Sequence, residues 1–134
     1  MADSEPWYWN DPDALVTAAY EGEFDNVRRF LAIGADPNQR NEDGETAVIV
    51  AAEFGFTPTI ELLLDAGADV NAVANNGDTA IKVARYSGGQ DTVSLLVARG
   101  AIDDGQPCFK ERVMDDYYSA MEIVNQKRRR RASD

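Results

Sequence analysis

Gly34-Ala35-Asp36-Pro37-Asn38 returns 33 residues later as Gly67-Ala68-Asp69-Val70-Asn71, and Gly100-Ala101 marks the same step once more. A second motif, Asp43-Gly44-Glu45-Thr46-Ala47, returns at the same offset as Asn76-Gly77-Asp78-Thr79-Ala80. Self-similarity at a fixed period of this length is typical of a solenoid, in which stacked units bury one continuous core. The sequence therefore predicts a stack of three units, a type of structure that presents a surface more often than it performs chemistry.

Each unit is predicted to contain two short helices separated by a glycine. In the second unit Thr46 stands at an N-cap position, where its hydroxyl can accept a hydrogen bond from the first turn. Gly55 ends the apolar run that follows, and Thr57-Pro58 starts the second helix, because proline is tolerated in a first turn. Gly67 ends this helix, and Asn76-Gly77 is a strong turn signal before the next unit.

The other two units follow the same plan, with Asp13 and Thr79 at the N-cap positions of the first and third units. The apolar residues expected to form the core recur at helical spacing. They are Leu15, Ala18, Ala19, Val27, Phe30 and Leu31 in the first unit, Ile60, Leu63 and Leu64 in the second, and Val93, Leu95, Leu96 and Val97 in the third.

The units resemble the ankyrin repeat, whose period is 33 residues. The motifs that carry the resemblance are Gly44-x-Thr46, Ala51-Ala52, Gly55, Leu62-Leu63-Leu64 and Gly67-Ala68-Asp69-Val70-Asn71-Ala72. The resemblance spans about residues 11–101 and implies an all-α solenoid of helix-turn-helix units with short hairpin loops. Ile49 and Lys82 stand where the family has a histidine that is expected to join neighbouring turns, which implies a stack less rigid than a consensus one.

Four segments are expected along the chain. They are an N-terminal aromatic segment at 1–10, the repeat domain at 11–107, a C-terminal capping helix at 108–126 and a basic disordered tail at 127–134. The capping helix is predicted from an amphipathic stripe of residues mostly four apart, namely Phe109, Val113, Tyr117, Met121 and Val124. Because the end of a solenoid exposes a core face, we expect this long helix to lie on the third unit.

The aromatic segment has two possible roles. Trp7-Tyr8-Trp9 precedes the first helix, and Pro6 and Pro12 favour an extended backbone there. The three rings either cover the open face of the first unit or anchor a partner, since Trp and Tyr are frequent hot-spot residues.

The charge of the chain is uneven. Its net charge is −11, but Lys127-Arg128-Arg129-Arg130-Arg131 holds five of the 13 basic residues and Asp134 only one of the 24 acidic ones. Residues 1–126 therefore carry 8 basic and 23 acidic side chains, a net charge of −15. This body is expected to repel nucleic acid and anionic membranes and to attract a basic protein. Solubility alone also explains the charge, which favours a monomer when the chain is free.

Composition argues against catalysis and against a membrane protein. The chain has no histidine, so a Ser/His or Cys/His pair cannot form within it, and Asn41 to Glu45 lacks the spacing of a calcium loop. We therefore predict no enzyme activity, no catalytic residue, no metal site and no cofactor. A single cysteine, Cys108, an acidic N-terminus and the lack of a long apolar run predict a cytoplasmic protein.

The resemblance also implies a site. In ankyrin domains ligands bind a concave surface formed by the hairpin tips and by exposed positions of the first helix of each unit. The corresponding tip residues are Arg40, Glu42, Asp43, Glu45, Val73, Asn75, Asn76 and Asp78. The helix positions are Tyr20, Glu21, Glu53, Phe54, Arg85 and Tyr86. Tyr20, Phe54 and Tyr86 are expected to form an aromatic stripe with acidic residues around it, which is a composition suited to protein binding.

Two functions remain open from the sequence. One is a non-enzymatic adaptor or inhibitor that binds a basic protein, in the manner of an immunity protein or an antitoxin. The other is a nucleic-acid-associated or nuclear-targeted protein that uses the arginine run at 127–131.

Overall fold

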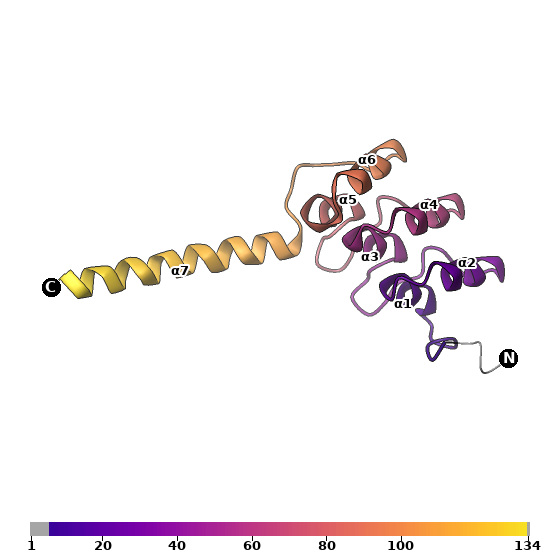
Figure 1. The fold of residues 1–134 in the computed structure, drawn as a ribbon, viewed down its shortest axis with the longest axis horizontal. Coiled ribbons are helices and arrows are strands. Elements are labelled where there is room, and N and C mark those ends of the chain that lie inside the picture. The colour runs from indigo at the N-terminus through magenta and orange to yellow at the C-terminus, as the bar shows by residue number, and fades with distance from the viewer. Residues whose placement is uncertain (1–5, 134) are drawn as a thin grey trace.

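A computed structural model describes residues 6–133. Three helix pairs stack side by side in this part of the chain, and a single long helix follows them (Figure 1). The pairs are α1 (Ala14–Tyr20) with α2 (Phe24–Ala32), α3 (Ala47–Phe54) with α4 (Thr57–Asp65), and α5 (Ala80–Val83) with α6 (Gln90–Ala98). The π-helical segment η2 (Ala84–Gly88) continues α5, and the last helix is α7 (Phe109–Ser133). The described residues contain no strand, and the predicted all-α solenoid is confirmed.

The first helices of the pairs form the inner layer of the core. Residues 47–52 of α3 are all buried, as are most residues of α1 and the start of α5. The second helices bury one side only, through Val27 and Phe30 in α2, Ile60 and Leu63 in α4, and Thr92 and Leu96 in α6. Of the predicted core residues, Val97 is misplaced, because 55% of its surface is exposed.

The first helix is capped by the predicted residue in two of the three units. Thr46 and Thr79 have extended backbones, and each hydroxyl accepts a hydrogen bond from the N–H three residues ahead at 3.4 Å. Asp13 does not cap α1, because its backbone is not extended and its side chain makes no capping bond. The N–H of Leu15 instead donates to Oε1 of Gln39 at 3.1 Å, so the neighbouring hairpin caps the first helix.

Two asparagines explain why the Gly-Ala-Asp-x-Asn motif repeats. The amide of Asn38 donates to the carbonyl of Gly67 at 3.2 Å and accepts from the N–H of Asp69 at 2.7 Å. Asn71 makes the same pair of bonds one period later. Its amide donates to the carbonyl of Gly100 at 3.1 Å and accepts from the N–H of Ile102 at 2.8 Å. Each asparagine thus joins its own unit to the loop of the next one.

The described part of the N-terminal aromatic segment, residues 6–10, forms turns rather than an extended chain, since the N–H of Trp9 donates to the carbonyl of Pro6 at 3.0 Å. Tyr8 is buried, and Trp9 packs against Phe30 with 4.9 Å between ring centroids. Trp7 is 80% exposed. Two of the three rings therefore cover the first unit, and Trp7 alone is accessible to a partner.

Tyr8 makes the stability of the fold depend on pH in alkaline solution. Burial, reinforced by the hydrogen bond to Glu23, raises the pKa of the Tyr8 hydroxyl to about 12. The unfolded chain loses this proton near pH 10 and the folded chain only near pH 12, so the folded state binds more protons in this window. We expect stability to fall between pH 10 and 12 and Tyr8→Phe to remove this part of the loss, as measured by urea unfolding at pH 8 and 11. An equally steep loss in Tyr8→Phe would contradict the assignment.

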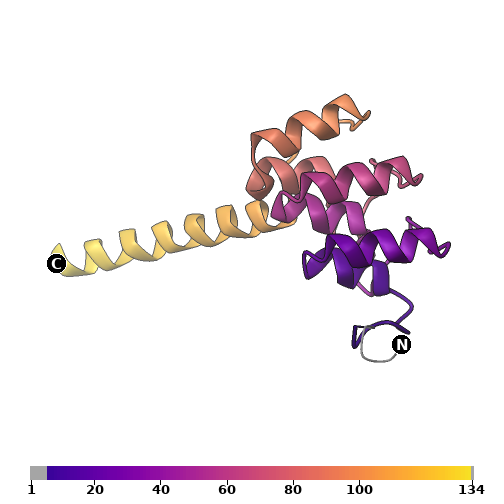
Figure 2. The ribbon, with the colours of Figure 1, turned by 45° about the vertical axis from the view of Figure 1, so that its right-hand side comes forward.

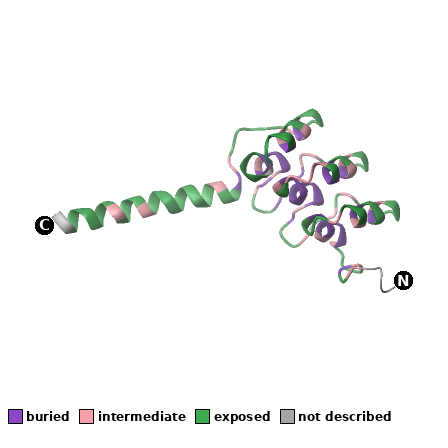
Figure 3. Cartoon of the chain, viewed as in Figure 1, coloured by how far each residue is buried: buried purple, intermediate pink, exposed green. Residues whose placement is uncertain are grey.

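The C-terminal helix differs from the prediction. It does not lie on the third unit but projects away from the stack beyond its first turn (Figures 1 and 2). Its stripe is accordingly open to solvent, with Val113 46%, Tyr117 54% and Val124 40% exposed (Figure 3). The run at 127–131, expected to be disordered, belongs to the helix, since arginine favours helices and cations at a C-terminus complement the helix dipole.

Candidate protein-binding surface

The hairpin tips are held together by bonds between neighbouring units. The guanidinium of Arg40 donates to the carbonyl of Gly44 at 2.6 Å and to that of Val73, one period later, at 2.7 Å. The amide of Asn75 donates to the carbonyl of Glu42 at 3.2 Å, and its N–H to the carbonyl of Asp43 at 3.0 Å. Arg40 and Asn75 therefore fix the shape of the surface as well as lining it.

Asparagine side chains also shape each tip from within. Oδ1 of Asn41 accepts from the N–H groups of Asp43 at 3.0 Å and Glu45 at 2.9 Å. In the next hairpin, Oδ1 of Asn76 likewise accepts from the N–H two residues ahead, that of Asp78, at 2.9 Å. The loop that faintly resembles a calcium site is thus closed by an amide, and no group of three metal-ligating side chains occurs among residues 6–133.

Two of the three predicted aromatic residues meet. Tyr20 and Phe54, from α1 and α3, contact edge to face with 5.4 Å between ring centroids. Both rings remain accessible, with Tyr20 60% and Phe54 44% exposed. Phe56 supports Phe54 from below at 5.6 Å, beside Gly22, and was not predicted although it directly follows the helix-ending Gly55. Tyr86 is not part of this group.

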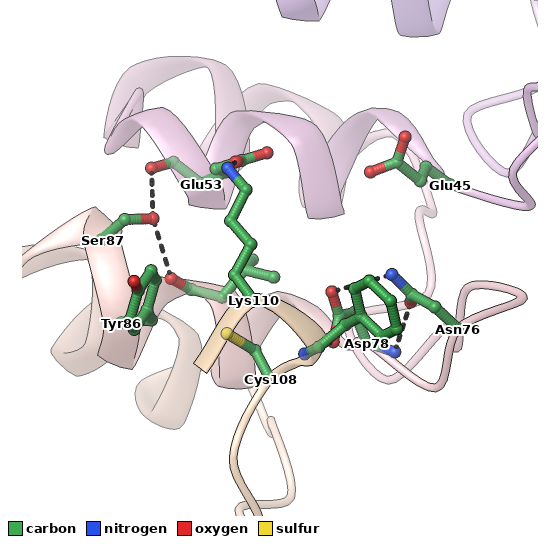
Figure 4. A pocket seen from close by; sticks show the side chains of 10 residues that line it. Glu45, Glu53, Asn76, Asp78, Tyr86, Ser87, Cys108 and Lys110 are labelled. Atoms are coloured by element: carbon green, nitrogen blue, oxygen red, sulfur yellow. Dashed lines mark hydrogen bonds and ion pairs between the residues drawn. The ribbon is translucent and has the colours of Figure 1, made fainter. Parts of the chain in front are cut away.

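A cavity occupies the part of the surface formed by the second and third units (Figure 4). Its lining combines the repeats with the start of α7: Glu45, Glu53, Asn76, Asp78, Val83, Tyr86, Ser87, Cys108, Phe109 and Lys110. Five of the predicted surface residues (Glu45, Glu53, Asn76, Asp78 and Tyr86) therefore line a cavity that the chain's own C-terminal segment helps to form. Asp78 is buried there and is not an exposed tip residue, contrary to the prediction.

The first turn of α7 is held by acidic and carbonyl oxygens of the repeats. The ammonium of Lys110 pairs with the carboxylate of Glu53, which raises the pKa of Lys110 above its usual value. The N–H of Phe109 donates to Oδ1 of Asp78 at 2.6 Å, and the guanidinium of Arg112 to the carbonyl of Asn76 at 3.0 Å. The sequence predicted a helix here but not these polar contacts, although Lys110 and Arg112 beside Phe109 are conspicuous in an acidic chain.

A family model for ankyrin repeats, in three copies, matches residues 15–105. The chain belongs to the ankyrin repeat family. No curated protein sequence matches it significantly. Ankyrin repeats form a protein-interaction module that is generally not enzymatic. None of the helices within residues 6–133 has both the length and the apolar composition needed to cross a bilayer.

The linker that follows the last ankyrin repeat is also bound to the surface. Arg85 pairs with Asp103 at 3.5 Å and donates to the carbonyl of Gln106. Lys82, at the position of the family's histidine, pairs with Asp104 at 3.5 Å and donates to the carbonyl of Gly77 at 3.4 Å. The N–H of Gln106 and then the charge of Lys82 hold the pKa of Asp104 below its usual value. Arg85 is therefore engaged within the chain.

The open part of the ankyrin surface lies on the first two units. The predicted residues that remain there are Tyr20, Glu21, Arg40, Glu42, Asp43, Glu45, Phe54, Val73 and Asn75. Within residues 6–133 no ion pair engages the carboxylates of Glu21, Glu42 and Asp43. The first two units thus carry an exposed aromatic pair next to Glu21, and further carboxylates on the hairpin that precedes α3.

Proposed function

We propose that the chain is a non-enzymatic ankyrin adaptor or inhibitor that binds a basic protein on the open part of its concave surface. The observation that carries this proposal is the exposed contact between Tyr20 and Phe54 next to Glu21, at the end of α1 and α3. Glu42 and Asp43, on the hairpin before α3, form no ion pair within residues 6–133 and would supply the acidic rim. Aromatic anchors inside a charged rim favour protein binding, because the rings supply buried area and the rim supplies orientation.

The chain's own first turn of α7 supports the choice of a basic partner. On the neighbouring part of the same surface, the carboxylate of Glu53 pairs with the ammonium of Lys110, and the carbonyl of Asn76 accepts a hydrogen bond from the guanidinium of Arg112. The net charge of −15 on residues 1–126 would also speed the encounter with a cationic protein at low salt.

A sharper form of the proposal is an inhibitor of the immunity-protein or antitoxin class, acting in the cytoplasm. A small acidic surface can block a basic nuclease or toxin by covering its cationic site, without any chemistry of its own. Inhibition of the captured partner's activity at one-to-one stoichiometry would distinguish this role from that of an adaptor. The net charge of −15 on residues 1–126 opposes the alternative of nucleic-acid binding.

The proposal predicts that acidic and aromatic substitutions act on different rate constants. Charge reversal at Glu42 or Asp43 is expected to slow association and flatten its salt dependence, because rim charges steer the encounter. Tyr20→Ala and Phe54→Ala are expected to hasten dissociation, with a loss of about 2 kcal/mol or more, roughly thirtyfold in Kd. Surface plasmon resonance at two salt concentrations, with a basic protein captured from native lysate, measures both.

Matched controls lie on the outer helices. Glu61→Lys changes an exposed charge on α4, and Val97→Ala removes an exposed apolar side chain on α6. Neither should alter binding by more than about twofold. If the controls weaken binding as much as the surface variants, the partner binds elsewhere and the proposed surface is wrong.

A further inference from the structure

The projecting part of α7 is amphipathic although no other element covers it. Met114, Tyr117, Met121 and Val124 follow one another at steps of three, four and three residues, the spacing of a coiled-coil seam. Val113 and Tyr118 widen this stripe, and all of its residues except Met121 are at least 37% exposed. The opposite face of the helix is mostly polar and carries Asp115, Ser119, Glu122 and Gln126, with one apolar residue, Ile123, among them.

A single helix of this kind gains little from its own hydrogen bonds. Isolated helices in water are marginal, and most helical stability in proteins comes from packing an apolar face. The repeats do not provide that packing, because only the first turn of α7 reaches them (Figure 3). The stripe therefore needs a partner outside this chain.

Charge along α7 selects the occupant and its direction. Residues 113–126 carry three carboxylates, Asp115, Asp116 and Glu122, and no cation, whereas residues 127–131 carry five cations in succession. A parallel pair of such helices would place the two cationic runs side by side. An antiparallel pair separates the two runs and places each one near the start of the other α7, where that helix leaves the acidic repeats.

We propose that α7 pairs with α7 of a second copy of this chain in an antiparallel coiled coil. The seam sets the register, with Met114 facing Val124 of the second copy and Tyr117 facing Met121. A dimer of this kind differs from the monomer that the net charge predicts, because the exposed apolar stripe favours association.

The same register brings the cationic run onto the acidic body. Arg128 to Arg131 of one copy align with residues 107–110 of the other, where α7 leaves the repeats. A groove lies there, lined by Asp43, Glu45, Asn75, Asn76 and Phe109. The arginine run therefore reaches carboxylates at the far end of the seam, and the uneven charge of the sequence is satisfied between the two copies.

The pairing of the stripes does not depend on the proposed function, although the arginine run uses Asp43 and Glu45, which also belong to the proposed partner surface. A basic partner and the run are thus expected to compete at these two residues. The tests below use the chain alone, so their failure would leave the partner proposal untouched.

The first test is the mass of the full chain in solution. Sedimentation equilibrium should give twice the 14.7 kDa mass of the chain at micromolar concentrations. Tyr117→Glu with Met121→Glu should give a monomer, whereas Ser119→Glu with Gln126→Glu, which adds the same charge on the opposite face, should leave the dimer intact. Circular dichroism checks that the repeats of both variants are folded. A monomeric parent chain, or a dimer that survives Tyr117→Glu with Met121→Glu, would overturn the proposal.

The second test is the direction of the pair. Two variants are made in a Cys108→Ala background, one with Met114→Cys and one with Val124→Cys. On oxidation, a mixture of the two variants should form at least tenfold more cross-linked dimer than either variant by itself. Efficient cross-linking of each chain with itself would show a parallel pair and overturn the antiparallel one.

The third test is the role of the cationic run. Lys127→Glu, Arg128→Glu and Arg131→Glu together should raise the dimer Kd at least tenfold. Adding Asp43→Lys and Glu45→Lys to the same chain should restore most of this loss, because the two sets of charges then match again. No restoration would show that the run does not reach this groove.

Discussion

Leu63→Ala is expected to destabilise the fold by about 2–5 kcal/mol, the cost of emptying a fully buried leucine position. Leu63 is completely buried on α4, and Leu96, one period later on α6, is buried to the same extent. Both side chains fill the space between a second helix and the inner layer, so the loss extends to the neighbouring units. Urea unfolding followed by circular dichroism measures the free energy of unfolding.

The control for this prediction is Val97→Ala, next to Leu96 in sequence. Because Val97 is 55% exposed, its truncation should cost less than about 1 kcal/mol. Near-neutral effects of both Leu63→Ala and Leu96→Ala would mean that the repeats are packed in another register.

Gly44→Ala is expected to cost about 2–4 kcal/mol, because it combines backbone strain with a collision between units. The φ angle of Gly44 is +73°, which side chains disfavour. A Cβ atom there would lie 2.4 Å from Oδ1 of Asn75 and 3.0 Å from its backbone nitrogen. The same side-chain amide donates through Nδ2 to the carbonyl of Glu42, and the backbone N–H donates to that of Asp43, so the bonds between the hairpins would have to shift.

Gly34→Ala separates the two contributions. Gly34 also has a positive φ, +92°, but a Cβ atom there would meet no atom within 4 Å. This variant should lose only the strain, about 1–2 kcal/mol. Equal losses in thermal or urea unfolding for the two variants would show that the close contact at Asn75 is relieved without cost.

The fold could be predicted from the sequence because a fixed repeat period indicates how the units pack on one another as well as which helices each unit contains. Thr46 and Thr79 cap their helices as their positions indicate. Asp13 stands in the equivalent place, yet Gln39 of the next hairpin takes over its role. This capping bond joins residues 24 positions apart in the sequence, so the local pattern around Asp13 does not indicate it.

The candidate site was harder to predict because the chain occupies part of it. Tyr20 and Phe54 meet as the repeat positions implied. Asp78 and Tyr86 lie against the first turn of α7 instead of solvent, which template positions within the repeats cannot indicate. The stripe of α7 likewise shows that the helix needs packing, but an amphipathic pattern does not say whether the same molecule provides it.

The paired asparagine bonds also distinguish the last unit of the stack from the two before it. Each bond pair requires a side chain that donates to one backbone group and accepts from another, which Asn38 and Asn71 provide. One period after Asn71 the chain has Asp104, whose carboxylate only accepts and is already engaged by Gln106 and Lys82. The third unit therefore lacks the amide that joins each of the first two units to the loop that follows, and its carboxylate binds the chain's own linker instead.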